Sequence, residues 1–283
     1  FFMKLCVADR VSTYVDAVYN NYMEHSGVSL LLATFFFTFQ IYCDFAGYSL
    51  IAIGSSKMMG FTLMENFHRP YFAKSIKEFW RRWHISLTTW FRDYIYIPLG
   101  GSRVGKWKSF RNTLVIFLVS GFWHGANWTF VAWGAYHALL FLPLLLLGQN
   151  RRYRDSVAEN SFLPSVKELT QMGVTFLLVL LGWILFRSED ISQAAVYLER
   201  MFNASLFSAP QLVGLGFGQL LLKKCFFFTA LMFVVEWIGR KQAHGMMIED
   251  LSLPVRYVIY TVLLIIIYGF DASNPQGFIY FQF

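Results

Sequence analysis

Two histidines lie among aromatic and apolar residues in this sequence. His124 occupies the stretch 120–128, which reads Ser-Gly-Phe-Trp-His-Gly-Ala-Asn-Trp, inside a long apolar run. Placing a titratable imidazole at membrane depth is costly, so such a residue is a candidate functional residue by default. His84 lies forty positions earlier, in the stretch 79–86, Phe-Trp-Arg-Arg-Trp-His-Ile-Ser. Two imidazoles on facing elements could meet in one cavity, where one takes the proton of a hydroxyl group.

A neutral amide follows the later histidine. Asn127 lies three residues after His124, which on a helix is roughly the same face. An imidazole that removes a proton and an amide that donates to a developing oxyanion would suit acyl transfer. The alternative for His124 is a structural histidine that bridges two helices, and for His84 an interfacial position. His137 is a third candidate, which we interpret as a helix-packing residue.

One acid interrupts an otherwise apolar span. Asp44 lies in the stretch 42–48, Tyr-Cys-Asp-Phe-Ala-Gly-Tyr. Buried acids in membrane spans are paired or line a cavity. We favour a structural partner such as an arginine from the basic segment 57–111, and the alternative is that Asp44 orients a catalytic group. Asn127, and Asp44 on this second interpretation, are the predicted substrate-binding residues.

The other reactive side chains form no recognisable site. No two of the six histidines have the spacing of metal ligands, and the cysteines are far apart, so we predict no metal site and buried, unpaired thiols. The sequence contains no phosphate-binding loop, nucleophile elbow or pair of acidic carboxylates. We therefore predict no bound cofactor. The three cysteines are Cys6, Cys43 and Cys225.

The composition is that of an integral membrane protein. The 283 residues are 56% hydrophobic and only 14% charged, against about 25% charged in soluble domains. Several apolar runs approach the ~20 residues that cross a bilayer, which predicts five or six membrane segments in a single all-α domain, 1–283. The segments are expected near 28–53, 113–147 (two passes or a broken helix), 169–186, 212–237 and 255–270.

Positive charge is concentrated in one segment. Residues 57–111 contain eleven Lys or Arg and three acids, a net charge of +8 in a chain that carries +7 overall. Short basic loops stay cytoplasmic, which explains the segment more simply than nucleic-acid binding, and it could also meet anionic lipid headgroups. Within it, aromatic residues recur at helical spacing over 79–96, which predicts one interfacial helix with His84 on its aromatic stripe.

The sequence resembles the membrane-bound O-acyltransferase family, and within it the bacterial branch that contains the alginate O-acetyltransferase membrane subunit. The stretches that carry the resemblance cover residues 42–49, 79–94, 97–103 and 120–125. The two histidine-bearing stretches, in this order and context, are its most specific part. Members of this family are longer, so the resemblance implies that this chain is the C-terminal part of such a protein. The sequence pattern at Phe1 agrees with this expectation, because the first residues are predicted to continue a partly amphipathic helix.

The resemblance implies a fold, a reaction and a site. The fold would be a ring of transmembrane and re-entrant helices around a central funnel, in the inner membrane of a bacterial cell. The reaction would be O-acyl transfer, with acetyl passed to hydroxyl groups of a cell-envelope polysaccharide such as alginate. His124 would be the catalytic residue and His84 a second functional residue. The donor would be acetyl-CoA or a carrier-borne acyl thioester, and an extracytoplasmic acyltransferase would be a partner protein.

Other functions remain open at this level. Leu50 follows Tyr48 and Ser49 where the alginate type often has an acid, which favours D-alanyl or other acyl transfer to teichoic acid or peptidoglycan. The stretch 97–101, Ile-Pro-Leu-Gly-Gly, favours the alginate type. Broken membrane helices with buried polar residues also fit a transporter without covalent chemistry. A scaffold that holds an external transferase is a further alternative.

Overall fold

The structure is a computed structural model that describes residues 1–147, 157–211, 218–242, 244–270 and 277–278. Within these ranges every regular element is a helix, as predicted. The chain divides into two compact units, one formed by Phe1–Leu63 with Tyr197–Phe283 and the other by Met64–Val196. We call them unit 1 and unit 2. The arrangement around a funnel and the single domain 1–283 stay predictions.

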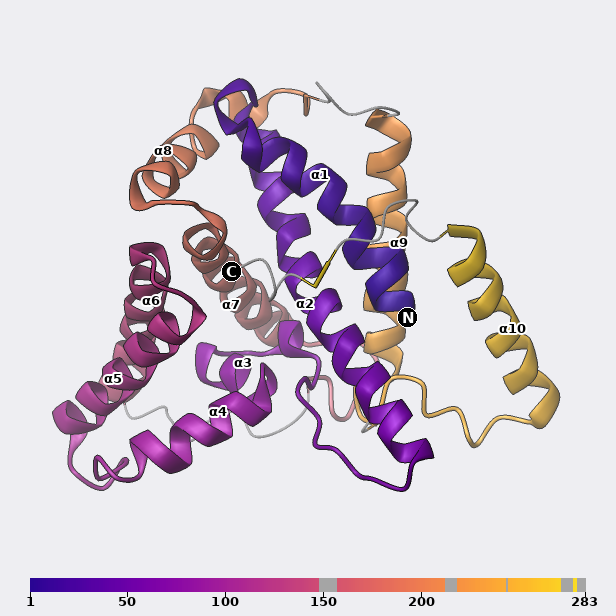
Figure 1. The fold of residues 1–283 in the computed structure, drawn as a ribbon, viewed down its shortest axis with the longest axis horizontal. Coiled ribbons are helices and arrows are strands. Elements are labelled where there is room, and N and C mark those ends of the chain that lie inside the picture. Colours follow the sequence, from indigo (N-terminus) through magenta and orange to yellow (C-terminus); the bar gives the residue numbers. More distant parts are fainter. Residues whose placement is uncertain (148–156, 212–217, 243, 271–276, 279–283) are drawn as a thin grey trace. The chain divides into compact units, whose positions relative to one another are not determined.

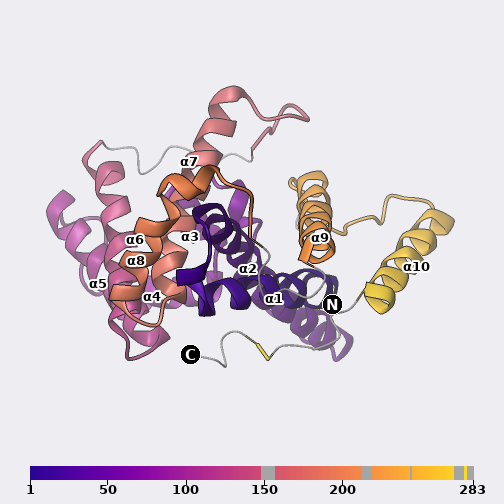
Figure 2. The ribbon, with the colours of Figure 1, turned by 90° about the horizontal axis from the view of Figure 1, so that it is seen from above.

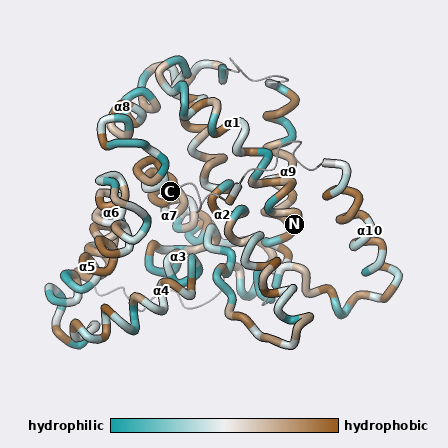
Figure 3. Tube along the Cα trace, in the orientation of Figure 1, coloured by the Kyte–Doolittle hydropathy of each residue, from teal (hydrophilic) through white to brown (hydrophobic). Residues whose placement is uncertain are grey.

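Unit 1 is built on the longest helix, α2 (Gly27–Met58). Helix α1 (Asp9–Asn20) packs along α2 with its apolar residues at i, i+3, i+4 and i+7, and these side chains are fully buried. The other helices of unit 1 are the π-helix η1 (Phe2–Ala8), the short 3-10 helices η2 (Tyr22–Glu24) and η5 (Ala204–Phe207), α9 (Gly218–Ile238) and α10 (Leu253–Phe270), with the end of α8 (Ile191–Met201). Figure 3 shows apolar residues along much of α9 and α10.

A buried group of charges ties the start of the chain to α2. The Nζ atom of Lys4 lies 2.8 Å from a carboxylate oxygen of Asp9 and 2.5 Å from one of Asp44. All three side chains are at least nine-tenths buried. We call Lys4, Asp9 and Asp44 the ion cluster. The partner expected for Asp44 was an arginine of segment 57–111; the structure corrects it to Lys4, because η1 folds back on α2 beside Gly47.

Unit 2 is built on a tight helical hairpin, α5 (Lys106–His124) and α6 (Trp128–Leu146). The two helices run side by side in both views (Figures 1 and 2). A Cβ atom added at Gly121 would lie 2.3 Å from the Phe130 carbonyl oxygen, and one at Gly134 would lie 2.2 Å from that of Phe117. Glycine at these two positions therefore permits the close approach of the two helices. Helix α7 (Val166–Arg187) packs against α6.

The predicted interfacial helix over 79–96 is wrong as a single helix. The chain instead forms α3 (Ile76–Arg82), α4 (Ile85–Phe91) and a π-helical turn, η4 (Arg92–Tyr96). A short 3-10 helix, η3 (Pro70–Phe72), precedes them. The chain then turns at Gly100 and Gly101, which both have positive φ.

Among the described residues, three helices are long and apolar enough to cross a membrane: α2, α6 and α7. The predicted spans near 28–53 and 169–186 correspond to α2 and α7, and the predicted run 113–147 divides into α5 and α6. Helix α10 is apolar but shorter than the other three along its apolar part. Part of the predicted span 212–237 falls on residues 212–217, outside the described ranges. The three cysteines are buried, as predicted, and none of them forms a disulfide.

Candidate active site

His84 lies at the break between α3 and α4. Its backbone is left-handed, with φ 41° and ψ 58°, a conformation that costs an L-residue about 1–2 kcal/mol. The freed backbone groups are satisfied from elsewhere, because His68 N donates to Arg82 O and Ile85 N donates to Asn66 O, both at 2.9 Å. Ser86 Oγ also donates to the Asn66 side chain. The break is therefore fixed by tertiary contacts, and such strain is characteristic of functional sites.

His124 also lies at a helix break. It is the last residue of α5, and Gly125 follows with φ 155° and ψ 162°. A Cβ atom at Gly125 would lie 2.9 Å from the Phe130 ring, so both backbone conformation and space favour glycine there. His124 is half-buried. The break thus leaves the imidazole at the end of a helix, with part of its surface accessible.

The structure brings the two histidines together. Both histidines contact the same indole ring: the ring centroid of Trp123 lies 6.2 Å from that of His84 and 4.9 Å from that of His124. Trp133 and Phe186 pack edge-on against His124, at 5.3 Å and 5.0 Å between centroids. We call His84 and His124, with these three rings, the histidine site.

Burial controls the charge of His84. The side chain is buried, and this burial lowers the pKa of His84 to about 4. At neutral pH it is therefore an uncharged imidazole, with one nitrogen that can accept a proton or hydrogen bond and one that can donate. Beside His124, this arrangement can remove a proton from a hydroxyl group and stabilise the charge that forms.

Asn127 has a different position from the one predicted. Because the helix stops at His124, Asn127 does not share a helix face with it. Asn127 is instead the N-cap of α6: its side-chain oxygen accepts from Thr129 N at 3.0 Å, and its amide nitrogen donates to Glu189 O at 2.6 Å. The same-face argument is wrong, and a role of Asn127 in substrate binding stays a prediction.

Asp44 and His137 have defined surroundings of their own. Asp44 belongs to unit 1, in the ion cluster, and its proposed role in substrate binding stays a prediction. His137 is completely buried in α6, where its Nδ1 atom accepts a hydrogen bond from Trp80 Nε1 at 3.3 Å. This contact joins α6 to α3, in agreement with the interpretation of His137 as a helix-packing residue.

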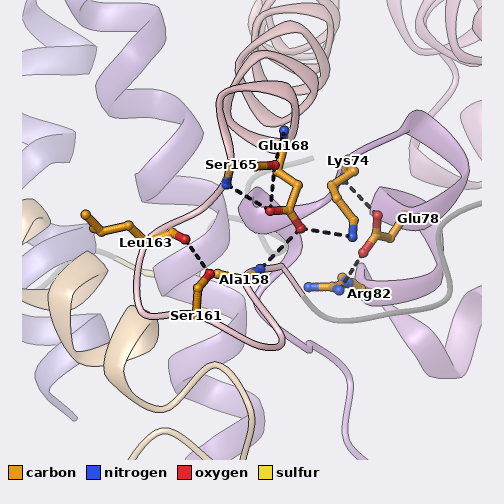
Figure 4. Close-up of polar contacts among 8 residues, drawn as sticks. All are labelled: Lys74, Glu78, Arg82, Ala158, Ser161, Leu163, Ser165 and Glu168. Carbon is orange, nitrogen blue, oxygen red and sulfur yellow. Dashed lines mark hydrogen bonds and ion pairs between the residues drawn. The ribbon is translucent and has the colours of Figure 1, made fainter.

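A polar network anchors the other end of α3 (Figure 4). Lys74 N donates to one carboxylate oxygen of Glu78 at 2.8 Å, and Arg82 Nη2 bonds the other at 2.5 Å. The Lys74 ammonium lies 3.6 Å from Glu168, which forms a capping box with Ser165 at the start of α7. Helix α3, which leads into His84, is therefore held at α7 by charges and at α6 by the bond from Trp80. Sequence reasoning missed this network, although the Ser165–Glu168 spacing was a readable signal.

Comparison with known proteins covers the part of the chain that contains both histidines. The sequence profile of the membrane-bound O-acyltransferase family (MBOAT) matches residues 1–157, more than half of the chain and including both histidines of the site. The chain belongs to this family. The chain is therefore a membrane-embedded, all-helical member, and its resemblance at residues 79–94 and 120–125 is confirmed at the level of the family.

Three relatives indicate the range of acceptors within the family. The chain is 40% identical over 227 residues to the probable alginate O-acetylase AlgI of Pseudomonas aeruginosa, covering 78% of this chain and 41% of that protein. It is 36% identical over 200 residues to the peptidoglycan O-acetyltransferase of Helicobacter pylori, covering 71% and 36%. It is 30% identical over 199 residues to the teichoic acid D-alanyltransferase of Bacillus subtilis, covering 67% and 49%. The chain thus spans less than half the length of each relative.

Proposed function

We propose that the protein carrying this chain transfers an acyl group, acetyl in the first instance, to hydroxyl groups of a cell-envelope polysaccharide. The observation that carries the proposal is the meeting of His84 and His124 beside Trp123, although forty positions separate them in sequence. Both residues lie at helix breaks, and both backbones at these breaks adopt conformations disfavoured for most residues. Helix packing alone does not explain why two helix breaks each carry a histidine and why both histidines contact the same ring.

The reaction divides between the two imidazoles. His124 accepts the proton of the acceptor hydroxyl as its oxygen attacks the acyl carbonyl carbon. When the carbon–sulfur bond of the thioester breaks, the proton passes to the leaving thiolate, so that an ester and a free thiol result. His84, uncharged at neutral pH, assists by holding His124 or the reacting hydroxyl with a hydrogen bond. General base catalysis of this kind contributes about 10²–10⁴-fold to the rate.

The donor and acceptor follow from chemistry and from the relatives. An activated acyl group must be supplied, which favours acetyl-CoA or a carrier-borne acyl thioester. The names of the relatives favour alginate or peptidoglycan as acceptor and acetyl as the group transferred. Similarity to a teichoic acid D-alanyltransferase supports D-alanyl transfer to teichoic acid as the second candidate. Membrane lipids surround the site, and an extracytoplasmic acyltransferase is the proposed partner protein.

The proposed location is the inner membrane of a bacterial cell, crossed several times. The helices α2, α6 and α7 have the length and composition of membrane spans. The net charge of +8 in residues 57–111 favours a cytoplasmic position for that segment. The donor would then approach from the cytoplasmic side.

The test is acyl transfer by the protein in liposomes, with labelled acetyl-CoA and an alginate acceptor. His124→Ala should reduce transfer by at least about 100-fold without changing thermal unfolding. His244→Ala is the matched control, since His244 is exposed in unit 1. Unchanged transfer in His124→Ala would refute the assignment. Full activity of the His84→Ala, His124→Ala double variant in complex with an external transferase would indicate a scaffold, and substrate movement without ester formation a transporter.

A further inference from the structure

Three nitrogen–hydrogen groups beside the histidine site have no acceptor among the described residues. They are the indole Nε1–H groups of Trp133 and Trp183 and the Nε2 atom of His137. Each side chain is at least 99% buried, with 1%, 1% and 0% of its surface exposed. A buried donor without a partner costs about 1–3 kcal/mol, and each such group in a native structure requires an explanation.

The proton on His137 is assigned by its hydrogen bond. Trp80 Nε1 can only donate, so His137 Nδ1, at 3.3 Å, must be the acceptor. A neutral imidazole with an accepting Nδ1 has its proton on Nε2. That Nε2–H group faces Gly182, where a Cβ atom would lie only 2.8 Å away. A side chain at position 182 would therefore collide with this donor, which glycine avoids.

The rings that carry the three donors contact one another beside His124. The Trp133 ring lies 5.1 Å from the ring of His137 and 6.1 Å from that of Trp183, onto which it stacks. Trp133 packs edge-on against His124, with 5.3 Å between ring centroids. Trp183 contacts Trp83, the residue before His84, at 5.1 Å between centroids. We call Trp133, His137 and Trp183 the donor group.

The chemistry of the donor group selects its occupant. All three donors are uncharged and set among aromatic rings, so they do not suit a phosphate or a carboxylate, which binds arginine and lysine. They suit an oxygen that is neutral at first and gains negative charge during reaction. The carbonyl oxygen of an acyl group has this property, and neutral donors in a water-poor setting stabilise it most strongly.

We propose that the donor group binds the carbonyl oxygen of the acyl group that His124 helps to transfer. This inference rests on the proposed function and adds to it the residues that hold the acyl carbonyl. As the hydroxyl oxygen attacks the carbonyl carbon, the electron pair of the C=O bond moves to this oxygen. The donors hold that charge until the carbon–sulfur bond breaks and the pair returns. A short acyl chain then lies against the aromatic rings of the site.

The experiment compares Trp133→Phe and Trp183→Phe with wild type in the full protein in liposomes. Each substitution removes an N–H group and retains an aromatic ring. Transfer from acetyl-CoA should fall by about 100-fold in each, in kcat more than in KM. Trp107→Phe is the control, because Trp107 is exposed and outside the site. Wild-type rates in both Trp133→Phe and Trp183→Phe would overturn the proposal.

A measurement independent of turnover separates this proposal from the function. The ultraviolet resonance Raman band that reports indole N–H hydrogen bonding should show free N–H groups in the ligand-free protein and bonded ones with acetyl-CoA. The change should be smaller in Trp133→Phe and Trp183→Phe. Groups already bonded before acetyl-CoA is added would indicate buried water, and no change on addition would exclude the carbonyl; either result overturns the proposal. Absence of transfer in wild type would instead contradict the proposed function.

Discussion

The ion cluster of unit 1 and the histidine site of unit 2 differ in what surrounds their buried polar groups. In the ion cluster, Lys4 lies within 2.8 Å of Asp9 and 2.5 Å of Asp44, so each carboxylate has an ammonium group beside it. In the histidine site, the imidazoles of His84 and His124 are packed among aromatic rings, at points where the helices break. The first arrangement holds helices together. The second arrangement keeps a strained backbone at His84 and a half-buried imidazole at His124, as a catalytic base requires.

The largest effect that tests this comparison is expected in the ion cluster. Lys4→Met removes the cation and leaves the carboxylates of Asp9 and Asp44 buried together. Breaking one partner of a buried ion group costs about 3–5 kcal/mol, so the free energy of unfolding should fall by that amount. Denaturant unfolding in detergent measures it. The triple variant Lys4→Met, Asp9→Asn, Asp44→Asn should regain most of the loss. Wild-type stability of Lys4→Met would contradict a structural role for the cluster.

Substitution of Gly125 should lower stability less than loss of Lys4 does, and it should also lower the rate of acyl transfer. Gly125→Ala places a Cβ atom 2.9 Å from the Phe130 ring in a backbone with φ 155°. The strain should lower the free energy of unfolding by about 1–3 kcal/mol and displace His124. A displacement near 1 Å lowers rates by about 100-fold. Gly173→Ala, on α7 where nothing lies within 4 Å, is the matched control. Equal rates for Gly125→Ala and Gly173→Ala would show that the break does not position His124.

Two tryptophans of unit 2, Trp80 and Trp183, allow a bonded indole N–H group to be compared with one that has no acceptor among the described residues. Trp80→Phe removes an N–H group that is bonded to His137, whereas Trp183→Phe removes one without an acceptor among the described residues. The first change leaves His137 Nδ1 buried and unsatisfied and should cost about 1–3 kcal/mol of stability more than the second. Thermal unfolding of the two variants gives the difference. Equal destabilisation would show that the indole of Trp183 is also hydrogen-bonded.

The smallest expected effect is a difference in stability between two variants at position 84. His84→Gly relieves the left-handed backbone at φ 41°, which should offset part of the lost ring packing. Relative to His84→Ala, His84→Gly should be more stable by about 1 kcal/mol, while both variants lose transfer activity. Denaturant unfolding compares them. A less stable His84→Gly would mean that the strain at the break is absent.

Periodicity and composition predicted the helices, because apolar runs of about twenty residues leave few alternatives. They did not predict the break at His84, since it depends on bonds from Asn66 and His68 that lie far back in the chain. The partner of Asp44 was missed for the same reason, because Lys4 lies forty positions away. The N-cap role of Asn127 was readable: Gly125 two residues earlier marks the end of one helix, and Asn is a favoured cap for the next.

The central claim is that His84 and His124 act as one unit on the acyl group. The most direct test is a double-substitution cycle, measuring transfer from acetyl-CoA in liposomes for His84→Ala, His124→Ala and the combination. Residues that act as a unit are strongly non-additive, so the double variant should be no slower than His124→Ala alone. Fully multiplicative losses, or transfer that survives in the double variant, would contradict the account.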